Sequence, residues 1–221
     1  MTLQESRLDL QRRRRLGMVE AVWGQHKSVD QIVAILQTMQ SAGELALVTR
    51  VDQTKAAAVQ ERCPAVQIHH QAACLTLGEI PVTGQESQVA VLSGGTSDRR
   101  VAEEAALALR VHGVATASFL DVGVAGLHRL LDVLPELRPM SVLIACAGME
   151  GALPTVLAGL VPQPVIGVPV SVGYGVSAGG RAALDGMLAS CAPGLSVVNI
   201  DNGYGAAMAA LRILKGAAAQ S

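Results

Sequence analysis

The sequence predicts an α/β protein in which a doubly wound parallel sheet over residues 85–221 follows a small α+β domain over residues 1–84. From residue 89 onward, short apolar runs alternate with helical segments, which is typical of a parallel sheet covered on both faces. The loops that follow the apolar runs are rich in glycine. The composition also changes near residue 84, from a mixed, Gln-containing chain to one rich in Ala, Gly and Val, so residues 80–87 are interpreted as a linker.

The composition supports a large apolar core. The chain has 221 residues, of which 50% are hydrophobic and only 2% aromatic, and its mean hydropathy is +0.39. The core must therefore be built from Ala, Val, Leu and Ile. The length allows one or two domains.

The charge pattern excludes several classes of function. Residues 1–88 contain nine basic and nine acidic side chains, and residues 89–221 contain eight basic and nine acidic ones, so no basic footprint for nucleic acid is visible. The long uncharged stretch Gly151–Gly180 contains four prolines and many glycines, so we do not expect it to span a membrane. The charged N-terminus lacks the apolar core of a secretion signal. We expect a cytoplasmic protein with reduced thiols.

The first domain is predicted in four parts. Leu3–Leu16 is interpreted as a charged helix. Ser28 and Gln31 form a capping-box pattern before a second helix that Gly43 ends. Leu45–Val51 is a short strand, and a small α+β unit follows to about residue 79.

The second domain is predicted as alternating strands and helices. The expected strands are Val89–Leu92, Val114–Leu120, Met140–Ala145, Pro164–Val170 and Leu195–Ile200. The expected helices are Arg99–His112, Val124–Leu134, Glu150–Leu160, Ser177–Ser190 and Gly205–Leu214.

Function is expected at the carboxyl ends of these strands, where ligands of open parallel sheets bind. The loops there are glycine-rich, and most carry a polar or acidic residue; they are residues 93–98, 121–123, 147–151, 171–175 and 201–205. The connections at the opposite ends of the strands consist mainly of Gly and Pro.

Three features of these segments have two interpretations each. The loop Ser93–Asp98 either binds an anion with its backbone N–H groups or is an ordinary turn with Ser97 or Asp98 as the helix N-cap. Glu150 is either a buried acid–base group or a first-turn carboxylate favoured by the helix dipole. Cys191 is either a small buried side chain or a nucleophile that needs a base or a cation to activate it.

Other candidate residues have mainly structural interpretations. Arg12–Arg15 is interpreted as a solvated or subunit-contact helix face rather than an anion site. His69 and His70 point to opposite faces of a strand, so they cannot share a metal ion directly. The four cysteines show no CxxC spacing. Trp23 is expected in the core, although it could instead cover a ligand.

Two families resemble the chain. Residues 89–170 resemble the phosphoribosylaminoimidazole carboxylase/mutase family of purine synthesis, through the Ser93–Asp98 loop and the stretch from Ile144 to Pro154. The Ser-Ala-His-Arg motif of that family is missing, and His128 is displaced into the following helix. That resemblance implies a flavodoxin-like, aminoimidazole-ribonucleotide-carboxylase-like fold.

The second resemblance covers almost the whole chain and is to the LarB family of nickel-pincer cofactor biosynthesis. It rests mainly on five segments: 121–129, 147–154, 171–175, 190–194 and 198–205. Weaker N-terminal matches are Arg14, Gly17, Glu20, Gly24, Lys27, Thr49 and Arg50, and Met18-Val19 replaces the usual Phe-Pro. The resemblance implies pyridinium-3,5-biscarboxylic acid mononucleotide synthase activity: carboxylation of nicotinic acid adenine dinucleotide by carbon dioxide, with release of AMP.

The LarB resemblance also implies roles for individual residues. Cys191 is the expected covalent nucleophile and Glu150 the expected base, for the thiol or for the ring proton. The expected substrate-binding residues are Ser93, Gly94, Gly95, Ser97, Asp98, Asp121, Gly123, Gly148, Met149, Ser171, Tyr174, Asp201 and Asn202. Mg²⁺ is expected to assist the pyrophosphate step, with no ligand assigned.

Two alternatives stay open at this point. The first is a purine-pathway carboxylase or mutase, and the second is a non-catalytic nucleotide-binding module on the same fold. The expected partners are a small-molecule nucleotide and further copies of the chain, up to an octamer, with no nucleic acid and no membrane.

Overall fold

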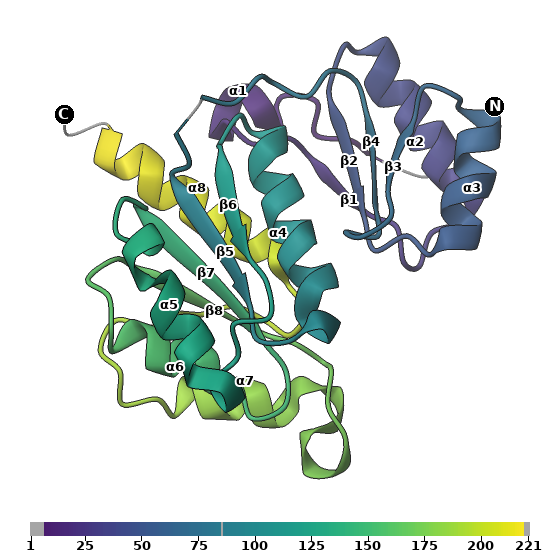
Figure 1. Cartoon of the computed structure of the whole chain (residues 1–221). Coiled ribbons are helices and arrows are strands. Elements are labelled where there is room, and N and C mark those ends of the chain that lie inside the picture. Colours follow the sequence, from purple (N-terminus) through teal and green to yellow (C-terminus); the bar gives the residue numbers. More distant parts are fainter. Residues whose placement is uncertain (1–6, 85, 219–221) are drawn as a thin grey trace. The chain divides into compact units, whose positions relative to one another are not determined.

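The computed structural model describes residues 7–84 and 86–218 and contains two compact units (Figure 1). The first unit comprises the chain up to Val82 together with Val111–Gly113, and the second comprises the remainder from Thr83 onward. Each unit has its own cluster of buried apolar side chains.

The first unit contains a four-stranded mixed sheet in the order β1-β2-β4-β3. Its strands are β1 (Ala21–Trp23), β2 (Ala46–Thr49), β3 (Gln67–His69) and β4 (Cys74–Leu77). β1 and β2 are parallel, and the other two pairs are antiparallel. Helices α2 (Val29–Ser41) and α3 (Gln53–Arg62) supply apolar side chains to the core of this unit.

Local sequence explains how α2 begins and why α1 is short. The Ser28 hydroxyl accepts from the Gln31 backbone N–H at 3.1 Å, and the Gln31 side chain accepts from the Ser28 N–H at 3.0 Å, so the predicted capping box is confirmed. The predicted helix Leu3–Leu16 is wrong for residues 7–11, because α1 covers only Arg12–Leu16; residues 3–6 lie outside the described residues. The backbone N–H of Asp9 instead donates to Glu20 at 2.6 Å.

The second unit contains a five-stranded, fully parallel sheet in the order β6-β5-β7-β8-β9. Its strands are β5 (Val89–Ser93), β6 (Thr116–Phe119), β7 (Val142–Ala147), β8 (Val165–Pro169) and β9 (Ser196–Val197). The three central strands are fully buried, as a sheet covered on both faces requires. The predicted doubly wound parallel sheet is confirmed.

Helices cover both faces of this sheet. They are α4 (Arg99–Val111), α5 (Leu127–Leu137), α6 (Ala152–Ala158), α7 (Arg181–Leu188) and α8 (Gly203–Ala218). Figure 1 shows α8 behind the sheet and α5 and α6 in front of it. Short 3₁₀ turns, Thr96–Asp98, Val124–Gly126 and Gly175–Gly180, precede α4, α5 and α7.

Several predicted elements have different bounds; the helix predicted at Ser177–Ser190, for example, is α7 from Arg181 to Leu188. The strand predicted at Leu195–Ile200 is only Ser196–Val197, because the backbone then leaves β8 except for single bonds from Val198 to Gly167 and from Asp201 to Pro169. The helix predicted at Val124–Leu134 is shifted to Leu127–Leu137, with Pro135 inside its last turn. Within the described residues, no helix is both long and apolar enough to cross a membrane.

The strand order places a topological switch point between β5 and β7. The chain passes from β5 outward to β6 on one side and then returns to β7 on the other side. The loops after β5 and β7 therefore diverge, and ligands of such sheets bind in the opening between them.

Candidate active site

A cavity of about 520 Å³ lies at this switch point. It is lined from the loops after four neighbouring strands, β5, β6, β7 and β8. The predicted residues that line it are Gly94, Gly95, Ser97, Asp98, Gly123, Gly148, Met149, Glu150 and Tyr174. Its volume falls within the range of small-molecule sites.

Glycines allow the four loops to approach one another closely. A Cβ atom on Gly123 would lie 2.4 Å from the carbonyl oxygen of Gly94, and one on Gly148 would lie 2.3 Å from that of Val172. Both contacts are with backbone, which cannot move aside as a side chain can. The glycine-rich loops are therefore a packing requirement at this edge of the sheet.

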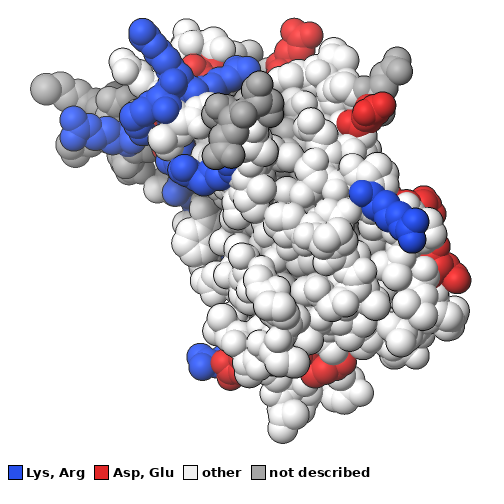
Figure 2. Space-filling view, turned by 90° about the vertical axis from the view of Figure 1, so that its left-hand side faces the viewer, with Lys and Arg blue, Asp and Glu red and all other residues white. Residues whose placement is uncertain are grey.

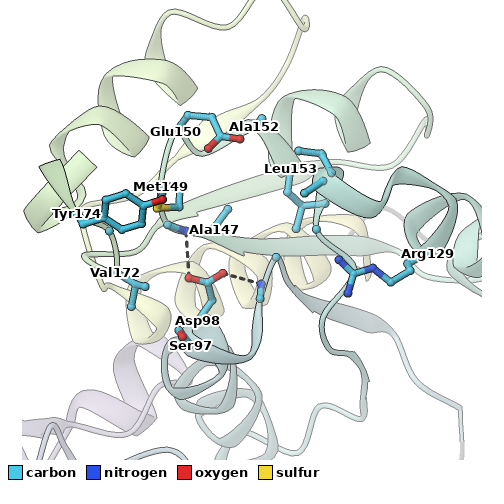
Figure 3. Close-up of a pocket in the computed structure, with 17 residues that line it drawn as sticks. Ser97, Asp98, Arg129, Ala147, Met149, Glu150, Ala152, Leu153, Val172 and Tyr174 are labelled. Atoms are coloured by element: carbon cyan, nitrogen blue, oxygen red, sulfur yellow. Dashed lines mark hydrogen bonds between the residues drawn. The ribbon is translucent and has the colours of Figure 1, made fainter. Parts of the chain in front are cut away.

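Asp98 joins the loops on either side of the switch point. One carboxylate oxygen accepts from the Gly95 N–H at 2.8 Å, and the other accepts from the Gly148 N–H at 3.1 Å (Figure 3). The residue is 6% exposed. Asp98 follows Gly95 by three residues and is not the helix N-cap that one interpretation predicted. Its oxygens hold the cavity wall together.

Several carboxylates lie near Asp98 and near Cys146 of β7. Burial raises the pKa of Asp98, the two backbone hydrogen bonds oppose that shift, and the nearby Asp201 adds to it. Burial also raises the pKa of the Cys146 thiol in β7 far above its ordinary value, with further contributions from Asp98, Glu104 and Asp201. Cys146 therefore stays protonated and is not a nucleophile.

Glu150 and Tyr174 lie on the open side of the cavity. Glu150 is exposed and precedes Gly151, the N-cap of α6, so both predictions for it, burial and a place in the first turn, are wrong. Tyr174 is 77% exposed and, like Met149, lines the cavity (Figure 3). The carboxylate of Glu150 therefore reaches both the cavity and solvent.

Arg129 is a lining residue that the sequence-based site list missed. It is on the first turn of α5, and its guanidinium donates to Asp121 at 2.6 Å. Among the described residues that line the cavity, it carries the only positive charge. The sequence pattern assigned Arg129 no role, because it is eight residues beyond Asp121 and reaches back to it only once α5 forms.

Several predicted site residues support the cavity without lining it. The Ser93 hydroxyl accepts from the Asp121 backbone N–H at 3.2 Å, and Asp201 accepts from the Ser171 N–H at 2.8 Å. Asn202 accepts from the Gly205 N–H at the start of α8. These side chains fix the backbone of the surrounding loops.

Cys191 also lies outside the cavity lining. It is exposed and follows α7. The preceding Ser190 accepts a hydrogen bond from Thr155 of α6 at 2.9 Å. A Cβ on Gly186 of α7 would lie 2.6 Å from the Glu150 carbonyl oxygen, so α7 runs against the segment that carries Glu150. The cavity of one chain does not contain both predicted catalytic side chains.

The remaining candidates do not form a second site. The described residues contain no group of three or more His, Cys, Asp or Glu side chains able to hold a metal ion. His69 bonds to Thr76 at 2.8 Å, and His128 is exposed and does not line the cavity. Trp23 is 52% exposed and contacts His26 edge to face, so the prediction that it is a core residue is wrong.

Comparisons with known proteins agree with this architecture. Residues 1–79 match the LarB/PurE-like N-terminal domain, and residues 88–220 match AIR carboxylase. A protein of Methanocaldococcus jannaschii, the uncharacterized protein MJ0165, is 38% identical over 220 residues, covering 95% of this chain and 84% of that protein. The chain belongs to the LarB family. Its C-terminal unit is an AIR carboxylase domain with the flavodoxin-like strand order.

Two further relatives match a shorter part of the chain. The N5-carboxyaminoimidazole ribonucleotide mutase of Methanocaldococcus jannaschii is 37% identical over 133 residues, covering 57% of this chain and 78% of that enzyme. The enzyme of the same description from Pyrococcus horikoshii is 32% identical over 148 residues, covering 61% and 76%. The two domains together indicate an enzyme of the carboxylase or mutase type.

Proposed function

We propose that the protein carboxylates the pyridinium ring of nicotinic acid adenine dinucleotide with carbon dioxide and hydrolyses its phosphoanhydride. The products are pyridinium-3,5-biscarboxylic acid mononucleotide and AMP, and the reaction is the first step of nickel-pincer cofactor biosynthesis. The observation that carries the proposal is a switch-point cavity with carboxylates and a single cation, and no histidine, among its described lining residues in a LarB-family chain.

The charges of the cavity suit this substrate. The pyridinium ring is a cation, whereas the carboxyl and phosphate groups of the dinucleotide are anions. Asp98 and Glu150 offer negative charge, and Arg129 offers positive charge on another side of the cavity (Figure 3). Separated charges of this kind orient a zwitterionic ligand.

The chemistry requires a nucleophile because a pyridinium ring is electron-poor. A thiolate adds to a ring carbon, and its electron pair converts the ring to a neutral dihydropyridine with a nucleophilic enamine carbon. That carbon attacks carbon dioxide and forms the new C–C bond. A base then removes the proton from the same carbon, and the C–S bond breaks with return of its electrons to the thiolate, which restores the aromatic ring.

We assign the thiolate to Cys191 and the base to Glu150. Cys191 is the exposed thiol, and Glu150 lines the cavity with a carboxylate that also contacts solvent. The positive charge of the ring favours the thiolate form of Cys191. Because Cys191 lies outside the lining, this covalent step requires the ring to extend toward the end of α7.

The predicted magnesium ion would not be bound by a cluster of protein side chains alone, as far as the described residues show. Among residues 7–84 and 86–218 no metal-binding cluster is present, and both oxygens of Asp98 already accept backbone N–H groups. A magnesium ion in this site would be held mainly by the phosphates of the substrate, because Mg²⁺ needs only one or two protein carboxylates. No step of the mechanism is derived through the metal.

The proposal is tested by incubating the protein with nicotinic acid adenine dinucleotide, bicarbonate and Mg²⁺ and analysing the products by mass spectrometry. We expect AMP and a mononucleotide with one added carboxyl group. Cys191→Ala and Glu150→Gln should abolish or strongly reduce both products. The matched control Glu136→Gln, at an exposed position in the last turn of α5, should retain activity.

Each of the other possible results would support a different mechanism or function. Product formation by Cys191→Ala would keep the reaction but reject covalent catalysis. Conversion of an aminoimidazole ribonucleotide in place of the dinucleotide would identify the purine-pathway reaction that the two archaeal mutases catalyse by name. Binding without any conversion would identify a non-catalytic nucleotide-binding module.

We further propose that the protein forms a homo-oligomer, up to an octamer. The face in Figure 2 carries few charged side chains over much of its area. Large apolar side chains are also exposed on the second unit, including Leu131, Val176 and Leu188. Light scattering of the purified protein tests this, and a monomeric mass would reject it.

A further inference from the structure

We propose that Arg129 is a specificity-determining residue that binds an anionic oxygen group of the substrate by exchanging Asp121 for it. This inference deepens the proposed function and rests on it for the identity of the substrate. The anionic group is either the ring carboxylate or a phosphate of the dinucleotide, because both present paired oxygens to a guanidinium fork.

The position of Arg129 carries the first step of the argument. The side chain lines the cavity from α5, and it is the one positively charged lining residue in the described part of the chain. The acidic lining residues Asp98 and Glu150 come from other loops. An anionic group entering this cavity therefore meets favourable charge at Arg129 and unfavourable charge at the carboxylates.

The bond between Arg129 and Asp121 suits exchange. The side chains are 37% and 49% exposed, respectively, so the ion pair contributes little to stability and either partner can regain water. Asp121 has φ +60°, a left-handed conformation fixed in part by the Ser93 hydroxyl on its N–H. The backbone of Asp121 is thus held in place, while the flexible arginine can turn toward a ligand.

Gly126 provides the space for the guanidinium. A Cβ atom at this position would lie 2.7 Å from Nε of Arg129 and 3.1 Å from one terminal nitrogen. The φ of Gly126 is −125°, which any residue can adopt. An alanine here would displace the tip of the arginine without straining the backbone. Gly126→Ala therefore moves the guanidinium but keeps its positive charge.

Titration calorimetry on the full chain tests the inference with nicotinic acid adenine dinucleotide, with NAD⁺, and with inorganic pyrophosphate. NAD⁺ carries a carboxamide in place of the ring carboxylate but retains the phosphates. The variants are Arg129→Gln, Arg129→Lys, Gly126→Ala and Asp121→Asn. Arg138→Gln is the matched control, since Arg138 is an exposed arginine at the opposite end of the same helix.

Arg129→Gln should weaken binding of nicotinic acid adenine dinucleotide about tenfold or more, the range for loss of a charge-assisted hydrogen bond. Arg129→Lys and Gly126→Ala should give intermediate losses. Asp121→Asn should tighten binding, because it removes the competing carboxylate and asparagine tolerates the left-handed conformation. Arg138→Gln should match the unmodified protein.

The ligands distinguish the two sources of the anion. If Arg129 binds the ring carboxylate, Arg129→Gln weakens the binding of nicotinic acid adenine dinucleotide but leaves the binding of NAD⁺ unchanged. If Arg129 binds phosphate, the variant weakens the binding of both dinucleotides and of pyrophosphate alike. Equal affinities of Arg129→Gln and Arg138→Gln for every ligand would overturn the inference.

Failure of the proposed function gives a different pattern. In that case the unmodified protein binds neither dinucleotide, while pyrophosphate binding that depends on Arg129 would still support the anion site. If the protein binds the dinucleotide and Arg129→Gln does not change that affinity, the proposed function stands and only the inference about Arg129 is rejected.

Discussion

At the scale of single residues, exposure separates the cysteines into two groups. Cys63, Cys74 and Cys146 are buried, and Cys191 is exposed. Cys146 lies in β7 next to the lining residue Ala147, but burial raises the pKa of its thiol and keeps it protonated. A reactive thiol in the folded protein is therefore expected at Cys191 alone.

Alkylation of the native protein with iodoacetamide should modify one of the four thiols. Peptide mapping should locate the label on Cys191, and Cys191→Ala should remain unlabelled until it is unfolded. The buried thiols are expected to react only in denaturant, because the reagent cannot reach them. Labelling of Cys146 in the native protein would contradict this assignment.

Asp98 is a second residue whose buried position determines what it contributes to stability. Asp98→Asn leaves one of the Gly95 and Gly148 N–H groups without an acceptor, because an amide has a single oxygen. The expected loss is about 1–3 kcal/mol in the free energy of unfolding at neutral pH. Denaturant unfolding measures it. Asp185→Asn, which breaks an exposed ion pair with Arg181, should cost less than about 1 kcal/mol.

The stability should also depend on pH through Asp98. Because burial raises the pKa of Asp98 in the folded state above its value in the unfolded chain, the folded state binds the proton more tightly. The contribution of Asp98 to stability therefore falls as pH rises through the folded-state pKa. Lowering the pH from about 7 to about 4 should shift the unfolding free energy in favour of the native protein relative to Asp98→Asn. A shift in the opposite direction would mean that the backbone hydrogen bonds outweigh burial.

At the scale of elements, the loops after β5, β6, β7 and β8 act as one assembly. Backbone approaches at Gly123 and Gly148 bring the loops together, and Asp98 links the loop after β5 to the loop after β7. The geometry of the cavity therefore depends on glycines, whose missing Cβ atoms allow the loop backbones to approach one another.

Gly148→Ala should destabilise the protein by about 1–3 kcal/mol and reduce ligand binding, because its Cβ would meet the Val172 carbonyl. Thermal unfolding and titration calorimetry measure the two effects. Gly159→Ala is the matched control, since its nearest neighbour is 3.5 Å away and its φ is −80°. Equal stability of both variants would show that the loops can separate without cost.

At the scale of the whole molecule, each of the two units has a cluster of buried apolar side chains of its own. One core is formed around β2, β4 and α2, and the other around β5, β7, α5 and α6. No buried residue of the described chain belongs to both clusters. We expect the two units to behave as the two domains that the sequence predicts.

Unfolding in denaturant should therefore proceed in two transitions. Trp23, the single tryptophan of the chain, lies in the first unit and reports on that unit by fluorescence. Circular dichroism reports mainly on the larger second unit. Coincident transitions by both probes would show that the two units unfold cooperatively.

Much of the second unit could be predicted because its signals are local and repeated. A buried apolar run such as Val89–Leu92, followed by a glycine-rich loop and a helix, predicts a parallel strand even when its neighbours in the sheet are unknown. The Ser28–Gln31 capping box is equally local, and the structure confirms it. Bounds were wrong where distant contacts decide, as at Asp9, whose N–H binds Glu20, and at Asp201, which returns to Pro169.

The sequence by itself determined the fold class, the family and the edge of the sheet where polar groups gather, because periodicity and motif spacing are properties of neighbours along the chain. Only the tertiary structure decided which of those groups face one cavity. It directed the oxygens of Asp98 to backbone N–H groups, left Cys191 outside the lining and brought Arg129 into it. The direction of a side chain depends on contacts between segments far apart in the chain, and local patterns carry no information about those contacts.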